Sequence, residues 1–398
     1  MMNQSGNMLS KENKMKITND IKYVGVNDKQ IDLFEGHFTV PNGMAYNSYV
    51  ILDEKIAIID GCDALVQDEW LKNVKEVLGD RKPDYIIIQH MEPDHSAPLM
   101  KIIELYPDVT VMAGEMAFTM FNNFFRGNNL KNKVVLKEGD ELSLGKHVLK
   151  FFAAPMVHWP EVFVTYDKTE KALFSADAFG KFGAFDYEED WACEARRYYF
   201  GIVGKYGIQV QMLLRKLSAV ELNVIYPLHG PILKENLSYY LGLYDKWSKY
   251  EPEAEGVFIA YTSVYGHTKA VVEEIAEKLK AKGCPKVSMA DLAREDIWEC
   301  VEDCFKYGKI IFATTTYNMS MFPYMHELLT ALVERNYQNR RIGFVQNGSW
   351  APVSGKLMKE KLSGCKNLEF VEPMVNLVSS KSEVNETEID ALVEAMLK

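Results

Sequence analysis

The stretch that decides the fold is Ile86–Pro98, with the sequence IIIQHMEPDHSAP. It begins as an apolar run typical of a buried strand and then presents four side chains that bind metal ions, His90, Glu92, Asp94 and His95. Packing four such groups in a protein interior is costly without a cation between them. Because residues two apart at the end of a strand point to the same side, we expect His90 and Glu92 to converge on one ion. The other two lie beyond a turn, where they can reach a second ion.

Three more residues of the same chemistry follow predicted strands. His158 lies in the loop PMVHWPE, Asp177 in SADAFG and His229 in PLHGP, and each loop comes after an apolar run. Active-site residues collect in such loops. Taken alone, a His after a strand is usually an ordinary loop residue, and an Asp in SAD is usually a turn former. Joined to the cluster at 90–95, however, these residues complete a set of metal ligands.

Length and composition are those of a globular protein with two domains. The 398 residues are 47% hydrophobic and 25% charged, with a formal net charge of −11, and a single core rarely grows so large. The negative charge disfavours binding to nucleic acid or to a membrane surface. No apolar run approaches the roughly 20 residues of a membrane span, and Met1–Met15 lacks the apolar segment of a secretory signal. We therefore expect a cytoplasmic protein.

The six cysteines are scattered and form no CxxC pair. This excludes a rubredoxin-type or zinc-ribbon site within the sequence. It is typical of reduced thiols in a cytosol rather than of a disulfide framework.

Two domains are predicted on either side of a polar seam, Lys249–Gly256. Before the seam, short apolar strand-like runs recur with few helices between them, which favours an α/β/β/α sandwich over 15–250. After it, strands alternate with helices, which indicates a parallel, doubly wound sheet over 251–398. Residues 1–14 are expected to form a flexible extension.

The second predicted domain opens with a hydroxyl-rich turn, Thr262–Thr268, of sequence TSVYGHT, between a strand and a helix. Backbone N–H groups and hydroxyls at a helix N-terminus form a cradle for an anion. The turn does not end in GK[ST], as a Walker A loop would, and the domain has no GxGxxG. It therefore predicts a phosphate site, although a Ser/Thr-rich turn before a helix is also a common N-cap.

Two later loops, at the carboxyl ends of predicted parallel strands, extend this site, since open α/β sheets bind ligands at that edge. Tyr317 and Trp350 offer flat apolar surface for a ring system, and the alternative is that both are core or cap residues. The predicted cofactor-binding residues are Thr262, Ser263, Val264, Tyr265, Gly266, His267, Thr268, Thr315, Thr316, Tyr317, Asn318, Asn347, Gly348, Ser349, Trp350 and Ala351.

The joined metal pattern resembles that of the metallo-β-lactamase superfamily, HxHxDH followed by a distant His, Asp and His. It departs at Glu92, which stands where the superfamily has its second His. Imidazole-rich sites suit zinc, whereas added carboxylate oxygen favours redox-active ions such as iron or manganese. HxExDH is the variant of the flavodiiron proteins, or A-type flavoproteins, in which a flavodoxin domain follows the lactamase-like domain. The resemblance covers nearly the whole chain.

The resemblance implies a diiron site in which Asp177 bridges the two ions. One iron would be held by His90, Glu92 and His158, and the other by Asp94, His95 and His229. Tyr198 and Tyr199 resemble a family segment near the metals, and both a hydrogen bond to the site and a purely structural role stay open for them.

The turn at 262–268 resembles the flavodoxin phosphate loop TxTGNT, with Tyr265 and His267 as departures. The two later loops resemble those that flank the isoalloxazine ring. The implied cofactor is FMN, which is favoured over FAD because only one phosphate loop is visible.

The function that the resemblance implies is reduction of O2 to water, of NO to N2O, or of both, with electrons delivered to the metals through FMN. Since rubredoxin-like cysteines are absent, the donor would be a separate protein such as rubredoxin. The resemblance also implies a head-to-tail homodimer, or a dimer of dimers, in which one subunit's FMN faces the other's metals. The main alternative is a zinc hydrolase with an appended flavodoxin domain. An electron carrier using FMN alone is disfavoured by the ligand set, and a nuclease by the charge.

Overall fold

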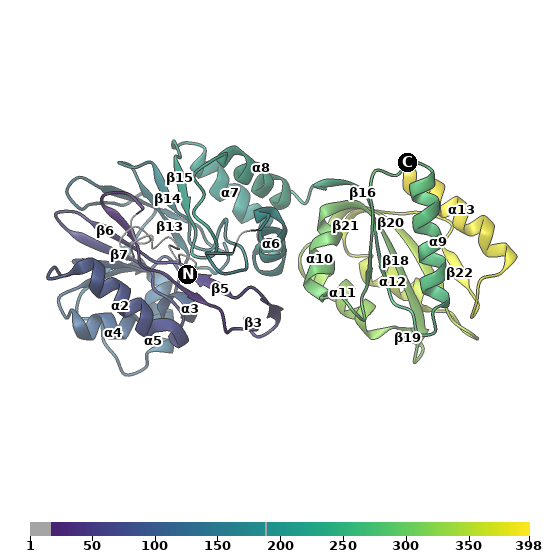
Figure 1. Cartoon of the computed structure of the whole chain (residues 1–398), viewed down its shortest axis with the longest axis horizontal. Helices are drawn as coiled ribbons and strands as arrows, with labels where there is room; N and C mark the ends of the chain where they lie inside the picture. The colour runs from purple at the N-terminus through teal and green to yellow at the C-terminus, as the bar shows by residue number, and fades with distance from the viewer. Residues whose placement is uncertain (1–16, 188) are drawn as a thin grey trace, which may run out of the picture. The chain divides into compact units, whose positions relative to one another are not determined.

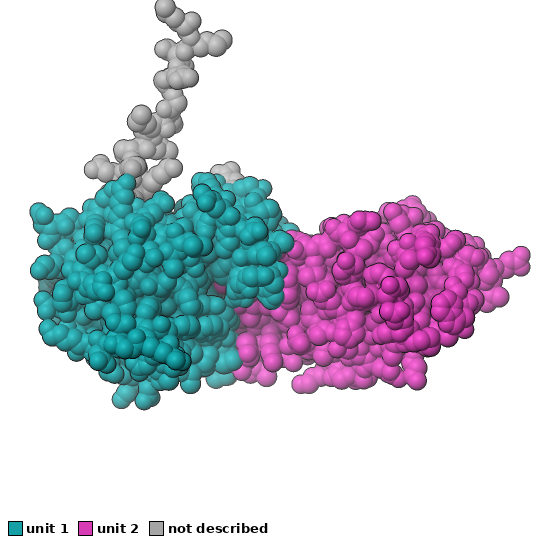
Figure 2. All heavy atoms as spheres, turned by 90° about the horizontal axis from the view of Figure 1, so that it is seen from below, with its two compact units in different colours: residues 1–195, 212–240 teal, residues 196–211, 241–398 magenta. Residues whose placement is uncertain are grey.

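The computed structural model describes residues 17–187 and 189–398, so the extension predicted at 1–14 lies outside them. The chain divides into two compact units, coloured separately in Figure 2. Unit 1 comprises residues 1–195 and 212–240, and unit 2 comprises 196–211 and 241–398. Across the described parts of both units, no helix combines the length and the apolar character needed to cross a lipid bilayer.

Unit 1 is built from two β-sheets (Figure 1). One sheet has the strand order β1-β6-β7-β8-β9-β10 and the other the order β11-β12-β13-β14-β15. Their facing sides share an apolar core in which Ile59, Phe151 and Phe174 are fully buried. The strands are β1 (Ile21–Tyr23), β2 (Val26–Asp28), β3 (Leu33–Phe34), β4 (Phe38–Thr39), β5 (Met44–Tyr46), β6 (Tyr49–Leu52), β7 (Ile56–Ile59), β8 (Tyr85–Ile87), β9 (Thr110–Gly114), β10 (Lys133–Leu136), β11 (Glu141–Ser143), β12 (Val148–Ala153), β13 (Phe163–Asp167), β14 (Ala172–Phe174) and β15 (Val224–Tyr226).

Helices cover the outer faces of this sandwich. Helix α2 buries Trp70, Val74 and Leu78, which recur at helical spacing, and it ends at Gly79, where φ is +56°. Lys216 of α7 donates to the carbonyl of Ala153, at the end of β12, over 2.7 Å. The helices up to the start of unit 2's sheet are η1 (Ala64–Val66), α2 (Gln67–Leu78), α3 (Pro93–Ser96), α4 (Leu99–Leu105), α5 (Glu115–Phe124), α6 (Trp191–Tyr198), η2 (Tyr199–Val203), η3 (Gly204–Tyr206), α7 (Gly207–Leu217) and α8 (Leu237–Ser248).

Unit 2 is a doubly wound sheet with the parallel strand order β17-β16-β18-β20-β21 (Figure 1). Helices α9 and α13 pack together over one face, where Val257, Ile311 and Val345 form the core with them, and α10, α11 and α12 lie on the other face. The elements are β16 (Ala254–Tyr261), α9 (His267–Ala281), β17 (Val287–Asp291), α10 (Ile297–Lys306), β18 (Tyr307–Tyr317), β19 (Ser320–Met321), α11 (Pro323–Glu334), β20 (Gln338–Asn347), α12 (Ser354–Leu362), β21 (Lys366–Phe370), β22 (Val375–Leu377) and α13 (Glu383–Leu397). The predicted fold class, a lactamase-like sandwich followed by a flavodoxin-like sheet, is confirmed.

Unit 2 also takes in the segment 196–211 from the N-terminal half of the chain. The ring of Phe200 stacks on Phe305, with centroids 4.0 Å apart. Arg196 forms buried ion pairs with Glu253, at 2.6 Å, and with Glu302. Because a buried carboxylate is stable only when it is paired, this segment completes the unit.

One predicted loop is part of a strand. The sequence pattern places Thr315–Tyr317 in a loop after a predicted strand, but β18 continues to Tyr317 and turns back into β19, with Tyr317 paired to Ser320. The two residues between them, Asn318 and Met319, have φ of +49° and +58°. A two-residue turn with positive φ at both positions matches the twist of a β-hairpin, which is why the strand extends so far.

Candidate metal centre and cofactor pocket

The cluster at 90–95 is carried by a loop and a short helix rather than by a strand end. β8 stops at Ile87, His90 and Glu92 lie in the loop that follows, and Asp94 and His95 lie in α3. The geometry expected from strand alternation is therefore wrong, although the two side chains do converge. The loop is held by the buried carboxylate of Asp60, which accepts from the backbone N–H groups of Gln89 at 2.8 Å and of His90 at 3.4 Å.

The first ligand group brings together residues from two separate loops. Nε2 of His90 lies 3.0 Å from Oε2 of Glu92 and 3.3 Å from Nε2 of His158. His158 in turn lies 3.1 Å from the same Glu92 oxygen. These three side chains thus point their donor atoms at one small space.

The second ligand group is arranged in the same way. Nε2 of His95 lies 3.1 Å from Nε2 of His229, and the Asp94 Oδ2 atom lies 3.2 Å from the first and 3.3 Å from the second. The ring of His229 is oriented by a hydrogen bond on its other nitrogen, because Nδ1 lies 2.7 Å from the carbonyl oxygen of Ala45.

Asp177 lies between the two groups and turns one oxygen to each. Its Oδ2 is 2.9 Å from His158 and 3.3 Å from His90, while its Oδ1 is 3.2 Å from His95 and 3.6 Å from His229. All seven predicted ligands therefore meet in one site, in the two groups that the resemblance implies.

The donor set fits two metal ions. Donor atoms at right angles about an ion with bonds of about 2.1 Å stand about 3.0 Å apart, which is close to the spacings observed. Asp177 is buried, and its Oδ1 accepts no hydrogen bond in the described structure, nor do the two oxygens of Asp94. Imidazole nitrogens that face one another in pairs likewise call for a cation between them.

The pKa values of the site report the same mutual attraction. Burial alone would raise the pKa of Glu92, but the contacts with His158 and His90 lower it to about 2. Burial would lower the pKa of His158, but its contacts with Asp177 and Glu92 raise it to about 9. Glu92 and His158 thus hold each other in charged form.

Sequence reasoning missed Glu161, which is buried beside the site. Its Oε1 lies 2.8 Å from Nδ1 of His90 and accepts from the backbone N–H of Met91 at 2.9 Å. The available signal was its position three residues after His158, in the loop PMVHWPE.

Tyr198 and Tyr199 are both buried. The Tyr199 ring packs against Tyr244 and Trp247, with centroids 5.1 and 5.4 Å away, and these are contacts of a core residue. Of the two roles left open by the sequence, the structural one is the one that these contacts favour for Tyr199.

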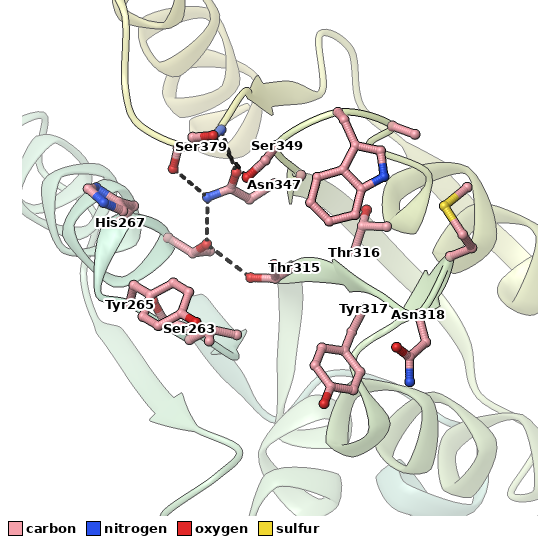
Figure 3. A pocket seen from close by; sticks show the side chains of 16 residues that line it. Ser263, Tyr265, His267, Thr315, Thr316, Tyr317, Asn318, Asn347, Ser349 and Ser379 are labelled. Carbon is pink, nitrogen blue, oxygen red and sulfur yellow. Dashed lines mark hydrogen bonds between the residues drawn. The ribbon is translucent and has the colours of Figure 1, made fainter.

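A cavity of about 540 Å³ opens in unit 2 at the carboxyl ends of β16, β18 and β20 (Figure 3). It is lined by every predicted cofactor residue except Thr262 and Gly266, and additionally by Met319 and Ser379. Thr262 is buried behind the cavity, where its hydroxyl lies 2.6 Å from that of Thr314. Gly266 is the N-cap of α9, with φ of +88° and no side-chain cap hydrogen bond.

The base of the cavity is a hydrogen-bonded network (Figure 3). Asn347 donates to the hydroxyl of Thr268 at 3.2 Å and to the carbonyl of Ser379 at 3.1 Å, and Thr268 lies 3.4 Å from the Thr315 hydroxyl. The network fixes the loops around the N-terminus of α9, where an anion is stabilised by the helix dipole and by N–H groups.

The rim of the cavity consists of aromatic rings that the protein leaves in solvent. Trp350 is 86% exposed, Tyr265 is 89% exposed and Tyr317 is 47% exposed, and all three line the cavity. Large exposed rings around a cavity mark a binding site rather than a core. The phosphate cradle and the flat apolar rim together fit FMN.

Comparison with known proteins identifies a matching family for each half of the chain. Residues 44–230 match the family model described as ODP family beta lactamase, and residues 258–371 match that of a flavodoxin domain. An uncharacterised protein of Methanocaldococcus jannaschii is 30% identical, over 79% of this chain and 80% of that protein. A nitric oxide reductase of Moorella thermoacetica is 29% identical, over 90% and 91%. The structure of rubredoxin oxygen:oxidoreductase from Desulfovibrio gigas superimposes with a TM-score of 0.89 at 25% identity, covering 96% and 98%.

A metallo-β-lactamase-like domain joined to a flavodoxin-like domain is the class that this fold defines. Within that class, the chain belongs to the flavodiiron protein family.

Proposed function

We propose that this protein is an oxidoreductase that reduces O2 to water, NO to N2O, or both, at a diiron site supplied with electrons through FMN. The relatives named for these two reactions support it, the nitric oxide reductase of Moorella thermoacetica and the rubredoxin oxygen:oxidoreductase of Desulfovibrio gigas. The zinc hydrolase alternative is not favoured by these comparisons.

The observation that carries the proposal is the carboxylate of Asp177, which turns one oxygen to each ligand group. A shared carboxylate holds two ions close enough to act on one small molecule. The Glu92 carboxylate, in place of an imidazole, favours iron over zinc at the first subsite.

When bound, the two irons would be the centre at which the gas is reduced, and FMN would supply electrons singly or in pairs. The protein would hold each iron with three side chains and the shared Asp177, which leaves positions open on a six-coordinate ion. It would also exclude water: the rings of Phe34 and Tyr46 pack on His229, and Trp159 packs on His90.

The electron donor proposed is a separate protein of the rubredoxin type. The Desulfovibrio gigas relative carries rubredoxin in its name, and an Escherichia coli relative is named flavorubredoxin. We place the protein in the cytoplasm, in keeping with its six cysteines, none of which forms a disulfide in the described structure.

We further propose that the working enzyme is a head-to-tail homodimer, or a dimer of dimers, in which the FMN of one subunit serves the metals of the other. The exposed aromatic rim of the cavity supports this, because apolar surface of that kind is typical of sites that a partner covers.

The activity is tested by reducing iron- and FMN-loaded protein without air and then adding O2 and NO in separate pulses, followed by electrode. We expect consumption of at least one gas, with about four electrons spent per O2 or one per NO. Protein depleted of metal but retaining FMN should consume neither gas at a comparable rate. Equal rates with and without metal, or lactam or thioester hydrolysis by zinc-loaded protein, would contradict the proposal.

The dimer is tested with a mixed pair of subunits. One carries Asp177→Ala and lacks the metal site, and the other carries Ser263→Glu, which puts a negative charge in the phosphate cradle. Purified through two different tags, the mixed dimer should recover one of its two FMN–metal pairs and consume gas, while neither parent does. An inactive mixed dimer, with each intact site still loaded, would contradict the head-to-tail arrangement.

A further inference from the structure

The two ligand groups differ in what stands behind their imidazoles. Nδ1 of His90 lies 2.8 Å from a carboxylate oxygen of Glu161, and both side chains are fully buried. Nδ1 of His229 faces the neutral carbonyl of Ala45, and Nδ1 of His95 has no hydrogen-bond partner in the described structure. Among the described residues, His90 is thus the one of these three imidazoles whose Nδ1 lies within hydrogen-bond distance of a carboxylate.

The contact fixes the tautomer of His90. An ionised carboxylate accepts but does not donate, so Nδ1 carries the hydrogen and Nε2 offers its lone pair to the ion. The same Glu161 oxygen accepts from the N–H of Met91, which leaves the carboxylate no freedom to turn away. A carboxylate behind an imidazole also makes the imidazole a stronger metal ligand.

Charge balance agrees with an anionic Glu161. Its Oε2 accepts no hydrogen bond within the described residues, although it is buried. Together with the three carboxylates of the ligand set, Glu161 balances the charge of two divalent cations.

We propose that Glu161 is a positioning residue that makes the two metal subsites unequal, so that the ion held by His90, Glu92 and His158 binds more tightly than the ion held by Asp94, His95 and His229. The inference rests on the proposed diiron site and adds an order to it: the His90 subsite fills first and empties last. Loss of a carboxylate behind a ligating imidazole typically weakens metal binding by about 10- to 100-fold.

The first test uses the unaltered full-length protein with FMN in place. Iron is removed gradually with a chelator until about one ion per chain remains, and anomalous diffraction then locates it. We expect the remaining ion beside His90. Equal occupancy of the two subsites, or retention of the ion beside His229, would overturn the inference.

The second test titrates metal-free protein, still carrying FMN, with Co²⁺ and follows the visible absorption of the bound ion. Glu161→Gln keeps an oxygen acceptor of the same size but removes the charge. We expect the tighter of two binding constants to weaken by about 10- to 100-fold and the weaker one to stay unchanged. Glu161→Asp, which keeps the charge on a shorter side chain, should lie between.

The control variant is Glu115→Gln, at an exposed position in the first turn of α5, which should reproduce the unaltered protein. Two unchanged binding constants in Glu161→Gln, with full FMN content, would overturn the inference but leave the diiron site intact. If the unaltered protein bound neither ion, the proposed function itself would fail.

Discussion

The metal centre of unit 1 and the cofactor cavity of unit 2 are built on opposite principles. At the metal centre, ionisable side chains such as Asp177 and His95 are buried and contact one another directly. At the cavity, neutral hydroxyls, an amide and a helix N-terminus form the base, and rings such as Trp350 stand in solvent. The first site is specified by which side chains are present, and the second by how the backbone turns. Single substitutions that remove a side chain should therefore affect the metal centre severely and the cavity mildly.

The largest effect is expected for Asp177→Ala, which removes one oxygen from each ligand group. Both irons should be lost and gas consumption should fall at least about 1000-fold, because the remaining buried groups no longer have a shared anion. Iron is measured by mass spectrometry and FMN by absorbance, which should not change. Asp68→Ala, at an exposed position, is the control. Retention of both irons would show that the metal centre does not depend on the shared carboxylate of Asp177.

A second substitution, Glu92→His, restores the imidazole of the lactamase pattern. The first subsite then offers three imidazoles and the shared Asp177, so zinc should compete better with iron during metal loading. The zinc-to-iron ratio, measured after loading from an equimolar mixture, should rise relative to the unaltered protein. An unchanged ratio would show that the carboxylate does not set the choice of metal.

Trp350→Ala should have a milder effect, since it removes one exposed ring from the rim of the cavity. An aromatic contact is worth about 0.5–1.5 kcal/mol, so the Kd for FMN should rise by no more than about tenfold. Fluorescence titration with FMN measures it, and the iron content should stay at the unaltered level. Phe124→Ala, which removes an exposed ring from unit 1, serves as the control. Iron loss in Trp350→Ala would mean that the two sites are not separate.

The smallest effect concerns His147, which lies in neither site. Burial would lower its pKa, but hydrogen bonds to Asp167 and Asp20 raise it. The protonated form therefore stabilises the fold, fully below the unfolded value of about 6.5 and less as pH rises through the raised value. His147→Gln should lose about 1 kcal/mol of unfolding free energy at pH 6 and less at pH 9. The groups around this imidazole are Asp20, Asp53, Lys146, Asp167 and Glu170.

Denaturant unfolding at the two pH values gives the answer. If the loss of unfolding free energy at pH 9 were equal to or larger than that at pH 6, protonated His147 would not be the stabilising form. Metal and FMN content should be the same in both proteins.

Much of the fold could be predicted because its strands are buried and apolar. The apolar segments 56–59 and 148–153, for example, form β7 and β12. The extension of β18 to Tyr317 could not be predicted, because Thr and Tyr next to Asn equally favour a loop, and only pairing with β20 and β19 makes this segment a strand. The bounds of the two domains stay a prediction.

At the metal centre, residue types pointed to the seven candidates, and the family resemblance implied how they group around two ions. The expectation that strand alternation brings His90 and Glu92 together was wrong. The loop after β8 is held by Asp60, which lies 30 residues before His90, and the sequence around His90 does not reveal this contact. Glu161 escaped notice for a similar cause: its role depends on a contact across 71 residues of sequence. At the cavity, Ser379 joins the site through its hydrogen bonds with Asn347 and Ser349, which lie about 30 residues earlier in the sequence.

The stacking of Phe200 on Phe305 and the pairing of Arg196 with Glu302 bear on how such a chain can be assembled from modules. A gene fragment beginning at residue 251 would encode every strand of the flavodoxin-like sheet, yet it would leave the Phe305 ring in water and the Glu302 carboxylate without its guanidinium. Recombination that shuffles this half as an independent cassette would therefore have to carry residues 196–211 with it.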